Sequence, residues 1–187
     1  MSRSHLERSL PRESLSLRPM DAPLDAEFLQ MVRHRMLDEY PGQIRACLDA
    51  LGEDDLWWRP HEQANAAGNL VLHLAGSNQF YFGHAIGGGP DVRDRDAEFG
   101  ARGQRSIGEV YAVYSAARTT VERVLDGLTP ARLVETTMAT GRSSSLACIL
   151  MHVTHHNALH IGQIVWLTKL RKPGSLHELL RGGPPPT

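Results

Sequence analysis

Four of the chain's ten histidines fall between positions 152 and 160. His152, His156 and His160 recur every fourth residue, which on an α-helix places them along one side, one turn apart. A neutral imidazole is the commonest protein ligand of a metal ion, and two imidazoles on successive turns can bind one ion from the same side. Because such a pair leaves coordination positions open, the pattern predicts a metal site whose third protein ligand comes from another part of the chain.

A helical wheel separates these histidines. With His152 at 0° and about 100° per residue, the apolar stripe within residues 149–161 covers roughly 60° to 180°. His160 falls inside this stripe at ~80° and His156 on its flank at ~40°, whereas His155 at ~300° faces solvent. His156 and His160 are therefore the predicted pair of ligands, and His152 lies further out.

A third ligand has one good candidate in another predicted helix. His73 lies at the edge of the apolar stripe of a helix expected over about 66–86. His84 lies on the same side, but about 16 Å along the axis, so it cannot bind the same ion. The alternative is that the histidines border the core and bind nearby helices by hydrogen bonds. A pair on successive turns with a third across the core favours metal.

The elements that position these residues follow helical periodicity. Amphipathic helices are expected over about 25–51, with a kink at Pro41-Gly42, over 66–86 with Asn65 as N-cap, from the capping box at Ser106 to residue 128, and over 145–171. No strand pattern competes, and residues 138–145 read as irregular. The fold class is therefore all-α, a four-helix bundle.

The connecting segments are less regular. Residues 91–99 alternate in charge, which favours a solvated loop held by its own ion pairs; the alternative is a lid whose arginines face an acidic ligand. Trp57 and Trp58 are expected to close one end of the core. Cys47 lies on an apolar stripe and is expected to be a buried structural thiol.

Length and composition suit one domain, with an arm at 1–22, the bundle at 23–174 and a tail at 175–187. The net charge of −1 argues against nucleic-acid binding through a basic face. Two distant cysteines form no disulfide framework and fit a reducing compartment. No secretory signal or membrane-spanning stretch is visible. We expect a cytoplasmic protein with no membrane association.

Three segments resemble the DinB/YfiT-like superfamily of metalloenzymes, most closely one of its bacterial branches. They are residues 69–76, the charged run 93–99, and residues 152–164, which end in His-x-x-x-His-x-Gly-Gln. The resemblance covers about residues 26–172. It implies a four-helix bundle and a metal triad of His73, His156 and His160, in agreement with the wheel. One departure is Ser77, where family members often have Asn; here Asn78 follows.

Three neutral histidines leave an ion open to water or to another ligand. Water would give a metal-dependent hydrolase, whereas a thiolate would give a transferase. The resemblance favours the second, since some superfamily members use low-molecular-weight thiols such as bacillithiol, mycothiol or glutathione. Zinc or nickel is the expected divalent metal.

Further site residues are suggested around the triad. Arg93 or Arg95 could hold carboxylates of the thiol cofactor. Gln163 is expected to orient a histidine or bind a ligand, and His152 to do the same or to act as a general base. No Glu or Asp stands next to the histidine pair, which disfavours a hydrolase with a glutamate base.

Three hypotheses remain open at this point. The first is a metal-dependent enzyme acting on a small-molecule substrate, thiol-transferase-like or hydrolase-like. The second is a non-catalytic metal-binding or stress-responsive bundle. The third is a metal-free helical interaction module. A homodimer is the expected assembly.

Overall fold

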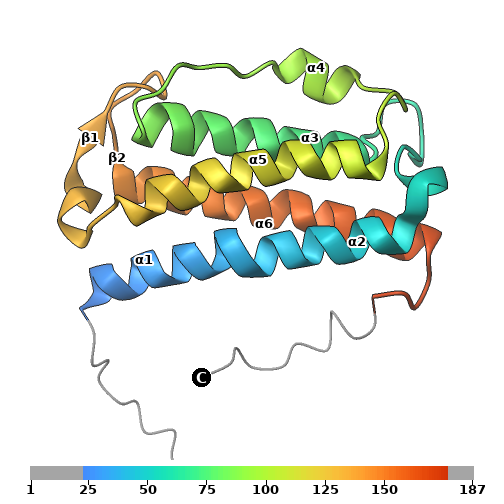
Figure 1. Ribbon diagram of the computed structural model, residues 1–187, viewed down its shortest axis with the longest axis horizontal. Helices are drawn as coiled ribbons and strands as arrows, with labels where there is room; N and C mark the ends of the chain where they lie inside the picture. The colour runs from blue at the N-terminus through green and yellow to red at the C-terminus, as the bar shows by residue number, and fades with distance from the viewer. Residues whose placement is uncertain (1–22, 177–187) are drawn as a thin grey trace, which may run out of the picture.

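The computed structural model describes residues 23–176, and within them it is an α-helical bundle, as the periodicity predicts (Figure 1). Four long helical stretches run α1 (Leu24–His34), η1 (Arg35–Glu39) and α2 (Tyr40–Asp55); α3 (Ala67–Asn78) and η2 (Gln79–Ile86); α5 (Ile107–Asp126); and α6 (Leu146–Arg171). α3 packs against α5 and α6, and α6 packs against α2. The predicted arm at 1–22 and residues 177–187 of the predicted tail lie outside the described residues.

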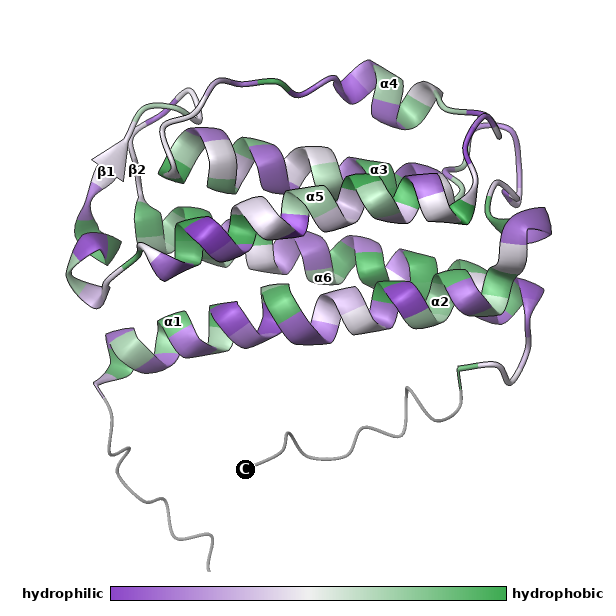
Figure 2. Ribbon diagram, in the orientation of Figure 1, coloured by the Kyte–Doolittle hydropathy of each residue, from purple (hydrophilic) through white to green (hydrophobic). Residues whose placement is uncertain are grey.

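The helices are amphipathic and their apolar faces form one core. Hydrophobic and hydrophilic residues alternate along each of them (Figure 2). Cys47 is fully buried in this core, as expected for a structural thiol. Trp57 is half-buried and donates a hydrogen bond from Nε1 to the Arg105 carbonyl at 2.7 Å. No helix within residues 23–176 has the length and apolar character needed to cross a bilayer.

The first helix is distorted one turn before the position expected from Pro41. The distortion is the π segment η1, and the helix then continues as α2, which contains Pro41 in its first turn. Proline has no N–H to donate to the carbonyl one turn back. The Leu37 carbonyl accepts a hydrogen bond from Arg118 Nε on α5 instead, at 3.0 Å. The proline therefore frees an acceptor that ties the first helix to the third.

The predicted helix starts agree with the structure at α5 and α6 but not at α3. Ser106 and Glu109 form the expected capping box at the start of α5, and Ser145 caps α6. Asn65 does not cap α3, which begins at Ala67. The Asn69 side-chain oxygen accepts the Ala66 N–H at 3.2 Å instead, and its amide nitrogen donates to the carbonyls of residues 98, 99 and 101.

The expectation of a solvated loop at 91–99 is wrong for its second half. Residues Arg95–Gly100 form a short helix, α4, capped by the Asp94 side chain, which accepts from the Ala97 N–H at 2.9 Å. α4 lies along α3, and Glu98 is buried against it. A second small difference is an antiparallel pair of two-residue strands, β1 (Thr136–Thr137) and β2 (Ser144–Ser145), in the segment expected to be irregular.

Candidate metal centre

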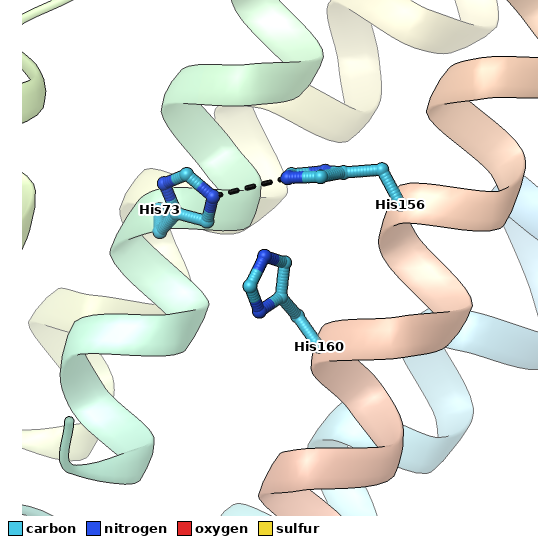
Figure 3. A group of neighbouring side chains, drawn as sticks. All are labelled: His73, His156 and His160. Atoms are coloured by element: carbon cyan, nitrogen blue, oxygen red, sulfur yellow. Dashed lines mark hydrogen bonds between the residues drawn. The ribbon is translucent and has the colours of Figure 1, made fainter. Parts of the chain in front are cut away.

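α3 and α6 bring three histidines together, as the sequence predicts. His73 comes from α3, and His156 and His160 come from successive turns of α6 (Figure 3). One nitrogen of each ring lies within 4.8 Å of the corresponding nitrogens of the other two. His73 is buried, and the other two are half-buried. The cluster therefore has one side in the core and one side toward the surface.

The spacing of two of these nitrogens suits a shared ion. His73 Nε2 and His156 Nε2 are 3.1 Å apart (Figure 3). Two nitrogens bound at about 2.0–2.1 Å to a tetrahedral ion would lie roughly 3.3 Å apart. The two rings are therefore already close to the separation that one ion requires, and the His160 ring lies 4.6 Å from His156 and 4.7 Å from His73 between centroids.

The other nitrogen of His73 is held by a buried carboxylate. His73 Nδ1 lies 2.8 Å from Glu98 Oε2. Since a carboxylate can only accept, Nδ1 carries the proton and Nε2 presents its lone pair to the cluster. A carboxylate behind a histidine is a common arrangement around protein-bound metal, where it fixes the ring and raises its basicity.

The two histidines of α6 have partners of their own. His160 Nδ1 lies 2.8 Å from Gln163 Oε1, and His156 Nδ1 lies 3.3 Å from Ser77 Oγ. The Gln163 contact requires the proton on His160 Nδ1 if its amide oxygen is the facing atom, which leaves Nε2 free. Each of the three rings thus has a polar partner at Nδ1, which leaves Nε2 as the nitrogen that could bind an ion.

Glu98 is itself fixed in place by a second ion pair. Arg93 donates from Nε to Oε1 at 2.9 Å and from Nη2 to Oε2 at 3.0 Å. Burial raises the pKa of Glu98, but the hydrogen bonds from His73 and Arg93 outweigh it and the pKa is lowered overall. Gly76 makes this approach possible, because a Cβ at that position would overlap Glu98 Oε1.

Protonation of the α6 pair is disfavoured. Burial, followed by the neighbouring histidines, lowers the pKa of His156 to about 3. Burial also lowers the pKa of His160, although its bond to Gln163 opposes the shift. Both rings are therefore neutral at physiological pH, the state that a metal ligand needs.

The remaining predicted residues surround the cluster at different distances. His152 is exposed, its Nε2 lies 2.9 Å from the Tyr81 hydroxyl, and its ring stacks on His156 with centroids 6.0 Å apart. Arg95 lies with its guanidinium 5.3 Å from the Phe99 ring centre, and Phe99 in turn packs 4.6 Å from the His73 ring. His155 is exposed, as the wheel predicts.

The sequence left open the roles of His84 and of Asn78, and the structure shows the contacts of both. His84 Nδ1 bonds the Gly89 carbonyl at 2.7 Å, outside the cluster. Asn78, which follows Ser77, forms a buried amide pair with Asn157 of α6, and Asn157 Nδ2 donates to Asn78 Oδ1 at 2.9 Å. The serine therefore contacts a histidine, while the asparagine joins the two helices that carry the triad.

Glu98 is the residue that sequence reasoning missed. It lies 25 positions from His73 within a run that reads as solvated. Asp94 followed by Ala97 is compatible with a helix start and could have indicated α4. Nothing local indicates that Glu98, rather than Asp94 or Asp96 of the same run, turns toward α3.

Comparison with known proteins identifies the family of this bundle. The family model described as mycothiol-S-transferase matches residues 32–170, most of the chain. The chain belongs to the mycothiol-S-transferase family. The solved structure of a DinB-like protein from Bacillus subtilis, YjoA, has a similar fold, which agrees with the predicted helical bundle. It is 19% identical with a TM-score of 0.56, and the match covers 75% of this chain and 91% of that one. No curated protein sequence matches the chain.

Proposed function

We propose that this member of the mycothiol-S-transferase family is a metal-dependent enzyme that transfers a low-molecular-weight thiol to a small electrophile. The observation that supports it best is the convergence of three Nε2 atoms whose rings are each oriented through Nδ1. Family membership supports a thiol as the co-substrate. By its family description mycothiol is the first thiol to test, with bacillithiol and glutathione as the alternatives.

In this proposal His73, His156 and His160 hold a divalent ion, zinc or nickel. An ion held there would lower the pKa of a thiol bound at the open position, so that the thiol could react as a thiolate. Glu98 and Gln163 act as positioning residues, since each holds a ring through Nδ1. His152 is the candidate acceptor for the thiol proton, at the Nε2 atom that now faces the Tyr81 hydroxyl.

The two arginines take different parts in the proposal. The Arg93 guanidinium is engaged by Glu98, so it supports the His73 carboxylate rather than a cofactor. Arg95 is exposed and lies beside Phe99, and its charge is close enough to contribute to the lowered pKa of His160. Arg95 therefore remains the candidate to contact the thiol cofactor.

A hydrolase fits the same residues less well. Glu98 is the carboxylate that hydrogen-bonds the triad within residues 23–176, and it does so from behind His73 while also binding Arg93. It faces away from the open position, so it cannot act as a general base on water there.

A cytoplasmic homodimer remains part of the proposal. Cys47 is buried and Cys148 is exposed, and both are free thiols, which fits a reducing compartment.

The test combines metal analysis with turnover. Protein purified without a histidine tag should contain about one ion per chain and should consume thiol in the presence of an electrophile. His160→Ala should lose most of the ion and reduce thiol transfer by more than about a hundredfold, since loss of a ligand costs more than loss of its supporting residue. His155→Ala, on the exposed side of the same helix, is the matched control and should change neither.

Two results would overturn this proposal. A metal content well below one ion per chain that His160→Ala leaves unchanged would favour a metal-free interaction module. A full complement of metal with no consumption of mycothiol, bacillithiol or glutathione would favour the non-catalytic metal-binding bundle.

A further inference from the structure

A pocket of about 220 Å³ lies beside the metal centre, at the N-terminal end of α6. Three elements form it: η2 through Tyr81, the turn between β1 and β2, and the first two turns of α6 through His152. Neither the proposed metal ligands nor their supporting residues line it. Of the residues assigned to the proposed reaction, His152 lines it.

The polar groups of this pocket favour a negatively charged ligand. Its lining offers the hydroxyls of Tyr81, Thr140 and Ser144 and the guanidinium of Arg142, and it contains no carboxylate. Within residues 23–176 no acidic side chain lies within ion-pair distance of Arg142.

The direction of α6 adds to this preference. The 26-residue helix begins at Leu146, and its first turn contains no acidic residue. The N-terminal end of a helix carries a partial positive charge, and here no side chain of the first turn neutralises it. The Arg142 guanidinium is the group that would bind an anion, and the helix end would only add to that attraction.

His152 joins the pocket to the metal centre. It lines the pocket, and its ring stacks on that of His156 at 6.0 Å. At 1.5 Å rise per residue, His152 lies about 6 Å and Cys148 about 12 Å along the axis from His156. A molecule that extends from the pocket past His152 therefore reaches the triad over roughly one to two helical turns.

We propose that the pocket around Arg142 binds the carboxylate of the electrophilic substrate, so that the enzyme prefers elongated, anionic electrophiles. This inference rests on the proposed function, because it assigns a substrate class to the same site. One guanidinium matches the single charge of a carboxylate and can bind both of its oxygens. The electrophilic carbon then lies toward His156, about one to two turns from the carboxylate.

The reaction implied is a substitution at that carbon. The thiol sulfur forms a C–S bond while the bond to the leaving group breaks, and the leaving group departs with the electron pair. The thiol proton passes to His152 Nε2, its acceptor in the proposed function. The carboxylate takes no part in these bond changes; it orients the carbon that does.

The test begins with binding and needs no turnover. 4-Methylbenzoate and the neutral 4-methylbenzamide are titrated into the protein, both with its metal and after removal of the metal by a chelator, and followed by NMR. The acid should bind at least about tenfold more tightly than the amide, in line with one charge-assisted contact. Arg142→Gln should remove this preference. Arg123→Gln, which removes the same charge from an exposed position on α5, should retain it.

The outcomes separate this inference from the proposed function. Equal binding of acid and amide, an unchanged preference in Arg142→Gln, or a preference that disappears with the metal would each overturn it; the last result would mean that the acid binds the ion. If the preference depends on Arg142 but no thiol is transferred, the pocket stands and the proposed activity fails. In an active enzyme, Arg142→Gln should raise KM for 4-(bromomethyl)benzoate about tenfold and leave KM for its methyl ester unchanged.

Discussion

Two buried carboxylates, Asp55 and Glu98, have the same exposure and different surroundings. The side chain of each is 7% exposed. Asp55 ends α2 and is bound by two cations of the α6 terminus, Arg171 at 2.7 Å and Lys172 at 2.9 Å. Glu98 is bound by one cation, Arg93, and by a histidine that is neutral when it serves as a ligand.

The difference indicates what each carboxylate does. Hydrogen bonding from Lys172, together with Arg171, lowers the pKa of Asp55. The charge of Asp55 is balanced by these two cations and stabilises the contact between α2 and α6. Glu98 has one fewer cation, so part of its charge acts on His73 and, through this ring, on the cluster. A buried ion pair alone is thus weak evidence of a functional site. Glu98 differs from Asp55 because one of its partners is the neutral histidine His73.

The sharpest test of this comparison replaces each carboxylate by its amide. Asp55→Asn should lower the free energy of unfolding by about 2 kcal/mol, because it leaves two cations beside a neutral group, and should leave metal affinity unchanged. Glu98→Gln should lower metal affinity about 10- to 100-fold, the usual cost of losing a group that supports a ligand. Denaturant unfolding and metal competition titrations measure the two quantities. Equal loss of metal affinity in both variants would remove the distinction.

A less drastic change moves Glu98 without replacing it. Gly76→Ala places a Cβ where Glu98 Oε1 now lies, so we expect metal affinity to fall about tenfold. Alanine favours the helix by about 1 kcal/mol, which should offset much of the cost in stability.

Gly42→Ala in α2 is the control, since a Cβ there meets nothing within 4 Å; it should stabilise the protein slightly and leave metal binding intact. If Gly76 acts through Glu98, the double variant with Glu98→Gln should bind metal no more weakly than Glu98→Gln alone. Additive losses would show that Gly76 acts by another route.

The smallest expected effect is the pH dependence of the metal-free protein. The pKa of His156 is about 3 when folded and about 6.5 when unfolded. Below pH 6.5 the unfolded chain therefore binds more protons, and stability falls as the pH falls toward 3. Allowing for solvent screening at this half-buried ring, we expect a loss of about 1 kcal/mol between pH 6.5 and 5.

His156→Asn should flatten this part of the stability curve measured by denaturant unfolding at each pH. A variant with the wild-type slope would show that other groups cause it. The lowered pKa also means that protons compete weakly for His156, so metal should remain bound to a lower pH than ordinary histidines would allow.

The helices and the α6 pair could be predicted from the sequence because they depend on local periodicity. The spacing of His156 and His160 and their angle to Ile149 and Ile161 follow from 3.6 residues per turn, whatever α6 packs against. Caps such as Ser106 with Glu109 are equally local. His73 could be proposed because it borders an apolar stripe, which already indicates the side that faces the core.

The features that could not be predicted depended on tertiary contacts between separate segments. Arg118 of α5 binds the carbonyl that Pro41 leaves free, and η1 precedes the proline, so the expected kink was misplaced. The Asn65 cap was wrong because Asn69 serves the helix start while also binding the α4 segment. These contacts join residues far apart in sequence, and no repeat or spacing encodes them.

The charged run at 91–99 shows most clearly what could be predicted from the sequence and what could not. The sequence by itself determined that helices α3 and α6 carry three histidines able to converge, because helical geometry places them there. Only the tertiary structure decided that Glu98, among similar charges, is buried behind His73 with Arg93 as its partner. The physical reason is that a carboxylate in water and a carboxylate in an ion pair look alike in sequence, and the packing of α4 on α3 selects between them.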